Sequence, residues 1–114
     1  YAHDCHNLIV IGRDAADMAT AANALIASGG GYVAVSGGEV RALAALPVGG
    51  ILAEKPVAEL AQDFDAFVEA ARIQGVNDDP ITLLSSLPLP VSPGFRPTDM
   101  GLVDVAKQKF VKKG

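Results

Sequence analysis

Apolar residues recur at helical spacing most clearly between Val57 and Ala71. Steps of three and four residues place side chains on one face of a helix. Pro56 suits the first turn of such a helix, and Gly75 supplies a stop. We therefore predict a helix over residues 56–74 whose aromatic side chains pack into the core. Its apolar face comprises Val57, Leu60, Ala61, Phe64, Phe67, Val68 and Ala71.

A second helix is predicted over residues 14–28. Asp14 stands at the N-cap position and Asp17 in the first turn, where carboxylates accept hydrogen bonds from free N–H groups and complement the helix dipole. The glycines at residues 29–31 suit the end of this helix, because glycine readily adopts the left-handed conformation. A phosphate-binding loop would instead require the N-terminal end of a helix. The apolar stripe consists of Met18, Ala22, Leu25 and Ile26.

A hairpin is predicted next, with strands over residues 32–36 and 39–43. Gly37 and Gly38 form a two-residue turn that tolerates the positive φ angles of a tight hairpin. Residues 46–50, Leu-Pro-Val-Gly-Gly, break the strand pattern and predict a loop in which the glycines allow a close approach of backbone.

Short continuous apolar runs at residues 8–12 and 81–87 are typical of buried strands. Residues 88–97 contain four prolines, a density that disfavours regular pairing and favours extended chain. A last short strand is predicted at residues 101–105.

The predicted order is therefore β-α-β-β-α-β followed by an extended proline-rich C-terminal arm. Neighbouring strands with helices on one face, joined by right-handed crossovers, predict an α+β fold. We expect a two-layer sandwich of the ferredoxin-like type.

Composition narrows the possible partners and compartment. A chain of 114 residues fits one domain with one core, which must be mainly aliphatic because only 5% of the residues are aromatic. A net charge of −4, with a short lysine-rich tail as the only basic cluster, argues against a nucleic-acid partner. No apolar run of about 18 residues and no leader are visible, so we expect a cytoplasmic protein that does not enter a membrane. Cys5 is the single cysteine, which excludes an intramolecular disulfide.

The candidate chemistry lies in one cluster, His3-Asp4-Cys5-His6-Asn7, which holds both histidines of the chain. These side chains donate, accept and titrate near neutral pH, so they suit a ligand-facing site. Alternatively they cap a strand and bond nearby backbone. We do not expect a metal site, because neighbouring side chains on an extended chain point to opposite sides and no other His or Cys completes a shell.

Four stretches resemble the C-terminal domain of bacterial adenine deaminases. The polar cluster and the apolar run ending at Gly12 are similar to the His-Asp-Ser-His-Asn motif, strand and glycine that open that domain. Residues 27–35, 46–50 and 98–105 agree in order and spacing. Cys5 stands where the family usually has serine, so a role that needs a hydroxyl there is not expected.

The resemblance implies that residues 1–114 are a C-terminal domain of a metal-dependent amidohydrolase that converts adenine to hypoxanthine and ammonia. It implies a divalent metal, manganese, iron or zinc, bound in a (β/α)8 barrel that this chain is too short to contain. We expect His3, Asp4, His6 and Asn7 to face the mouth of that barrel, where they either hydrogen-bond adenine or brace a loop of the metal site. No catalytic residue or metal ligand is expected in this domain. A homo-oligomer is also expected.

Two other functions remain open at the level of sequence. A unit of this size and order also suits a regulatory module of the ACT type, which binds small molecules between paired domains. A purely structural role, covering the barrel or forming a dimer contact, is the third reading.

Overall fold

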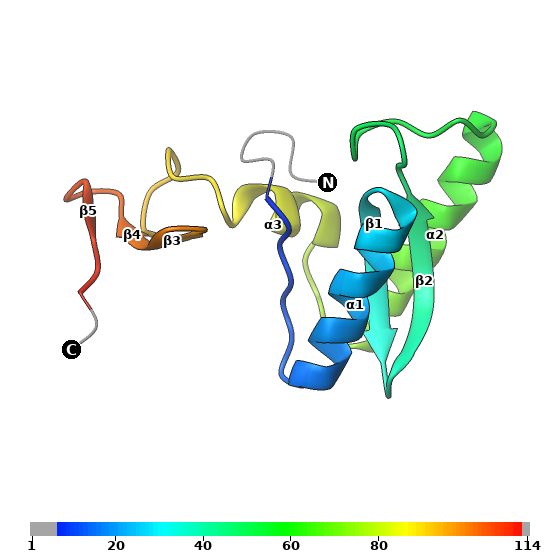
Figure 1. The fold of residues 1–114 in the computed structure, drawn as a ribbon, viewed down its shortest axis with the longest axis horizontal. Coiled ribbons are helices and arrows are strands. Elements are labelled where there is room, and N and C mark those ends of the chain that lie inside the picture. The colour runs from blue at the N-terminus through cyan, green and yellow to red at the C-terminus, as the bar shows by residue number, and fades with distance from the viewer. Residues whose placement is uncertain (1–6, 113–114) are drawn as a thin grey trace.

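The computed structural model describes residues 7–112, which form three helices and two small antiparallel sheets (Figure 1). The predicted α+β class is confirmed, whereas the β-α-β-β-α-β order is not. The elements are, in chain order, α1 (Ala15–Ser28), β1 (Gly31–Ser36), β2 (Glu39–Ala45), α2 (Val57–Ile73), α3 (Pro80–Ser86), β3 (Phe95–Thr98), β4 (Gly101–Asp104) and β5 (Lys109–Phe110).

Helix α1 begins and ends where the sequence predicts. The Asp14 carboxylate accepts a hydrogen bond from the Asp17 N–H at 2.9 Å, which satisfies one of the free donors of the first turn. Gly29 ends the helix with φ 79°, a left-handed conformation that glycine adopts without a steric penalty. One residue of the predicted stripe differs, because Ile26 is 70% exposed while Ala21 is buried instead.

The predicted hairpin is confirmed. Strands β1 and β2 pair antiparallel through the turn Gly37-Gly38, whose φ angles are 64° and 77°. The Asp17 carboxylate also binds this turn, accepting hydrogen bonds from the N–H groups of Gly37 at 3.1 Å and Gly38 at 2.6 Å. One side chain therefore ties the start of α1 to the tip of the hairpin.

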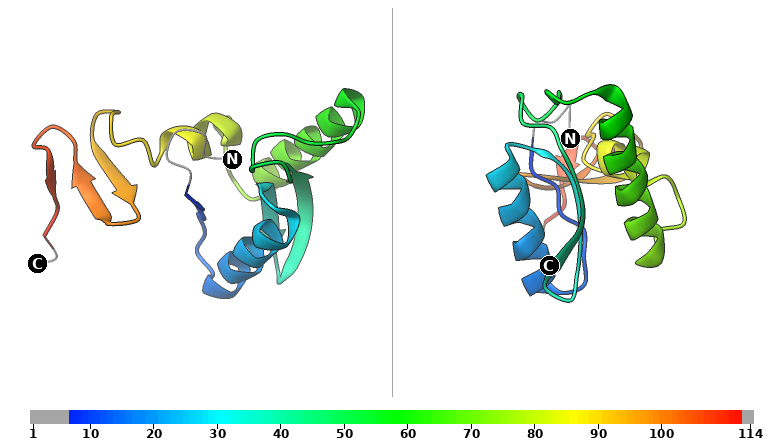
Figure 2. Two further views of the ribbon diagram at one scale, coloured as in Figure 1. Left: turned by 45° about the horizontal axis from the view of Figure 1, so that its top comes forward. Right: turned by 90° about the vertical axis from the view of Figure 1, so that its right-hand side faces the viewer.

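The two-stranded sheet lies between α1 and α2, which cover its opposite faces (Figure 2). On the α2 face, the Tyr32 ring contacts those of Phe64 and Phe67, with centroids 5.6 Å and 5.2 Å apart. The prediction that α2 packs these two aromatic residues into the core is confirmed. The predicted two-layer sandwich is not, since a helix lies on each face. The main core comprises Tyr32, Ala34, Ala42, Ala44, Leu46 and Phe67.

The strand predicted at residues 81–87 is wrong, because this segment forms α3. Asp79 caps the helix, accepting hydrogen bonds from the N–H groups of Ile81 at 3.3 Å and Thr82 at 3.1 Å, and Pro80 occupies the first turn. These start signals, together with Ile81 and Leu84 packing on the core at helical spacing, outweigh the continuous apolar run.

The strand predicted at residues 8–12 is also wrong in this structure. The segment is extended but is paired with no strand among residues 7–112. Leu8 is 50% exposed and Ile11 54% exposed, so the apolar run is not buried as a strand would be.

The C-terminal arm, which we define as residues 93–112, forms a separate three-stranded meander in the order β3-β4-β5. The predicted strand at residues 101–105 is confirmed as β4. The expectation that prolines prevent pairing fails at Pro97, which lies opposite Leu102 within β3. Strand β3 is at the edge of its sheet, where a residue without an N–H is tolerated.

Candidate functional site

The predicted polar cluster falls mostly outside the described residues. His3, Asp4, Cys5 and His6 precede the first described residue, so their predicted role is untested. Asn7 is described, and its side chain is exposed at the rim of a large cavity.

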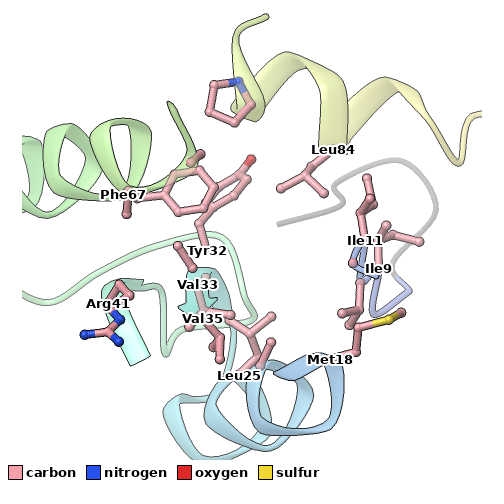
Figure 3. Close-up of a pocket in the computed structure, with 18 of the residues that line it drawn as sticks. Ile9, Ile11, Met18, Leu25, Tyr32, Val33, Val35, Arg41, Phe67 and Leu84 are labelled. Carbon is pink, nitrogen blue, oxygen red and sulfur yellow. The ribbon is translucent and has the colours of Figure 1, made fainter. Parts of the chain in front are cut away.

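This cavity has a volume of about 1710 Å³ and runs along β1, between residues 7–14 and α1 on one side and α2 and α3 on the other. Figure 3 shows its side chains directed inward from these elements. Leu25 of α1 lies beside Val33 and Val35 of β1, while Ile9 and Ile11 lie across the opening. The apolar lining includes Ile9, Ile11, Met18, Leu25, Val33, Val35, Phe67 and Leu84.

Three charged side chains on the cavity wall are engaged in the fold. The Asp14 and Asp17 carboxylates bind the backbone of α1 and of the hairpin turn, as described above. Arg41 donates from Nε to the Ser36 carbonyl at 3.1 Å and pairs with Glu39 at 2.9 Å. These contacts hold the hairpin, so the wall presents mainly apolar surface to the cavity.

A glycine-lined contact joins two of the sequence motifs. A Cβ placed on Gly30 would lie 2.6 Å from the Gly50 Cα, and Gly30 has φ 124°. The Leu46 N–H donates to the Gly30 carbonyl at 2.9 Å. The close backbone approach predicted for residues 46–50 is therefore confirmed, and its partner is the end of α1.

The same contact lies beside a short loop with exposed apolar side chains, which the sequence did not predict. Val48 and Leu52 form an isolated antiparallel bridge, and both are exposed, as is Ile51 between them. The signal was present in the sequence as three aliphatic residues beside glycines, but a loop assignment alone does not show which side chains face solvent.

Similarity to known proteins identifies the family. The model of the adenine deaminase C-terminal domain matches residues 1–109. The chain belongs to this family.

Named relatives agree with this assignment. Adenine deaminase 2 of Shouchella clausii (strain KSM-K16) is 52% identical over 112 residues, which cover 97% of this chain and 20% of the relative. The adenine deaminase of Clostridium perfringens (strain 13 / Type A) is 44% identical over 118 residues, covering 100% of this chain and 21% of the relative. That of Gluconobacter oxydans (strain 621H) is 43% identical over 110 residues. The chain thus spans about a fifth of the length of these relatives.

The resemblance recognised from sequence is therefore confirmed, and the chain is an adenine deaminase C-terminal domain. The glycine contact between residues 29–31 and 46–50 gives a physical reason for two of the matching stretches, since side chains at Gly30 or Gly31 would collide with backbone. The last of the four stretches, residues 98–105, forms the β3-β4 turn and β4 of the arm.

Among the described residues, the two ionisable groups with shifted pKa values do not line the cavity of this adenine deaminase domain. Hydrogen bonds from the Thr82 hydroxyl and N–H lower the pKa of Asp79 at the start of α3. A hydrogen bond from Lys107 lowers the pKa of Asp104 in the arm. Both shifts reflect local capping contacts rather than a catalytic arrangement.

Across residues 7–112 no group of three or more His, Cys, Asp or Glu side chains is placed to hold a metal ion. Within the same part of the chain, no helix has the length and hydropathy needed to cross a membrane.

Proposed function

We propose that the protein to which this domain belongs hydrolyses adenine to hypoxanthine and ammonia. The observation that carries the proposal is the family match over residues 1–109, together with relatives that are named adenine deaminases. Those relatives are about five times longer than the matching region, so the proposal concerns the full-length protein.

The reaction requires an activated water molecule to attack the ring carbon that carries the amino group. We assign that chemistry to a divalent metal, manganese, iron or zinc, in a barrel domain outside this chain, where a bound metal lowers the pKa of water. The described residues bring no suitable set of ligands together, so no step is assigned to a metal on this domain.

This domain is proposed to cover the mouth of the barrel, with His3, Asp4, His6 and Asn7 facing the substrate. Asn7 supports this placement, because its side chain is exposed and makes no hydrogen bond to any other described residue. An amide both donates and accepts, which suits pairing with the edge of adenine. Such pairing also discriminates strongly against purines that lack the matching group.

The test uses the full-length enzyme and steady-state hydrolysis of adenine. We expect His6→Ala and Asn7→Ala each to lower kcat/KM by about tenfold or more, equivalent to about 1.4 kcal/mol of transition-state stabilisation. The melting temperature should not change. Asn77→Ala is the matched control, because Asn77 is exposed in the α2–α3 loop and does not line the cavity.

Two outcomes would contradict this assignment. If Asn7→Ala left kcat/KM unchanged and lowered the melting temperature, the cluster would belong to the fold. If the full-length protein turned over another aminopurine but not adenine, the proposed substrate would be wrong.

The isolated chain provides a second test. We expect no adenine hydrolysis by residues 1–114 with added manganese, iron or zinc, because the proposed water-activating centre lies elsewhere. Turnover above background that a chelator abolishes would overturn this. The full-length enzyme is further proposed to be a cytoplasmic homo-oligomer, which light scattering of the purified protein and fractionation of cells would check.

A further inference from the structure

The two edges of the β1-β2 sheet differ in how they are protected. Strand β2 begins with two charged residues, Glu39 and Arg41, which are exposed and paired with each other. Strand β1 reads Gly-Tyr-Val-Ala-Val-Ser, with neither a charge nor a proline. Natural proteins protect exposed strand edges with charges, prolines or a covering element. The sequence of β1 is therefore typical of a strand whose outer edge is covered by another element.

The cavity lies along this edge. Over residues 33–36, β1 is paired with β2 alone among the strands of the described chain. A volume of about 1710 Å³ exceeds the roughly 300–1,000 Å³ typical of a small-molecule site. Its lining is mainly apolar on both faces of the sheet, with Leu25 beside Val33 on one face and Leu84 on the other. These dimensions and this chemistry fit a polypeptide segment better than a metabolite.

The nearby segment at residues 8–12 does not supply the missing neighbour. It runs in the same direction as β1 on the far side of the cavity, with α1 covering one face of the sheet (Figures 1 and 2). From this position, direct pairing with β1 would create a left-handed β-α-β crossover. Such crossovers are right-handed in about 98% of cases.

We propose that a strand from the part of the polypeptide outside this chain pairs with the outer edge of β1 at residues 33–36 and fills the cavity with apolar side chains. The relatives supply the occupant, because the chain spans only 20% of their length. Added strands bind through backbone hydrogen bonds along an open edge, and alternate side chains enter the pockets beside it. A third strand also relieves the marginal stability of a two-stranded sheet.

The inference rests on the chain being part of a longer protein and not on the reaction that the protein catalyses. Amide hydrogen exchange on the full-length enzyme tests it independently of any activity assay. We expect the amides of residues 33–36 that point away from β2 to exchange at least about a hundredfold more slowly than unprotected amides. Outward amides of β2 near Val40 are the internal control and should exchange rapidly. Exchange of the β1 amides within about tenfold of the unprotected rate would overturn the proposal.

A pair of variants separates this strand from other occupants. In the full-length enzyme, Val33→Lys places a charge in the cavity and should accelerate exchange of the outward β1 amides by more than about tenfold. Val40→Lys, on the exposed edge, should leave it unchanged. If Val33→Lys does not fold, the exchange pattern of the unsubstituted enzyme still decides the matter.

Two results would assign the edge differently and overturn the proposal. Protection that disappears on dilution to the monomer would make a second copy the occupant. Rapid formation of a disulfide between residues 11 and 33, in an Ile11→Cys, Val33→Cys enzyme with Cys5→Ser, would make the occupant the chain's own residues 8–12. A disulfide of ordinary geometry needs Cα atoms about 4.4–6.8 Å apart.

Discussion

We define the sheet unit as residues 15–73. The sheet unit and the C-terminal arm each contain a small antiparallel sheet, but only the sheet unit has a hydrophobic core. Apart from Pro80 and Pro88, every buried apolar side chain among residues 7–112 lies between Ala21 and Ala71. Strands β3, β4 and β5 contact one another but no other helix or strand of the described chain. The arm extends away from the sheet unit along the long axis of the molecule (Figure 1).

The two regions differ because helices cover the sheet of the sheet unit but not the sheet of the arm. In the sheet unit, α1 and α2 remove both faces of a two-stranded sheet from water, and this burial supplies most of the stability of small sheets. In the arm, Phe95 is 61% exposed and Phe110 is 54% exposed, so the meander depends on backbone hydrogen bonds and local turns. Antiparallel strand pairing therefore accompanies a buried core in the sheet unit. In the arm, the same pairing sets the backbone conformation without burying a core.

The largest effect is expected from removing the central aromatic ring of the sheet unit. Phe67→Ala should lower the free energy of unfolding by about 3–5 kcal/mol, because Phe67 is only 2% exposed and packs on Tyr32. Phe110→Ala in the arm should cost less than about 0.5 kcal/mol. Urea denaturation of the two variants measures both, and equal losses would erase the distinction between the regions.

A glycine pair tests the backbone contact within the sheet unit. Gly30→Ala should cost about 2–5 kcal/mol, since it combines a collision with Gly50 and an unfavourable φ of 124°. Gly49→Ala is the control for φ alone, because Gly49 has φ 64° and no atom within 4 Å of the added Cβ. It should cost about 1–2 kcal/mol. Thermal unfolding of both variants decides whether steric contact adds to conformational strain.

Removing the arm should matter little to the sheet unit. Truncation after Ser92 deletes β3, β4 and β5 but retains the buried Pro88. We expect the free energy of unfolding of the remainder to change by less than about 1 kcal/mol, as for changes at exposed sites. A larger loss in chemical denaturation would show that the arm supports the fold through contacts that strand pairing alone does not reveal.

The smallest effect is expected from acid. The folded-state pKa values of Asp79 and Asp104 lie below the usual 3.8, so each carboxylate stabilises the folded chain above that pH. That contribution is lost as pH falls through the lowered folded-state pKa. Carboxyl titration by NMR should give midpoints below 3.8 at both residues, and the protection factor of the Thr82 N–H should fall once Asp79 is protonated. Asp79→Asn should remove the pH dependence at α3 and leave that at Asp104 intact.

Local signals in the sequence determined the elements of the sheet unit. Asp14 and Gly29 delimit α1, the Gly37-Gly38 turn fixes the hairpin, and the apolar period from Val57 identifies α2. Each signal acts within a few residues, through a cap, a positive φ or the side-chain spacing on one face. The adenine deaminase family was likewise recognisable, because its motifs keep their order along the chain.

Tertiary structure decided what depends on distant partners. An apolar run becomes a strand only if another strand edge accepts its backbone, and residues 8–12 have none within the described chain. Conversely, Ile81 and Leu84 of a similar run pack on the core of the sheet unit as part of α3. Among residues 7–112, the lack of strand pairing at residues 8–12 and the pairing of residues 33–36 with β2 alone depend on contacts between segments that are remote in sequence. No periodicity within one segment encodes such contacts.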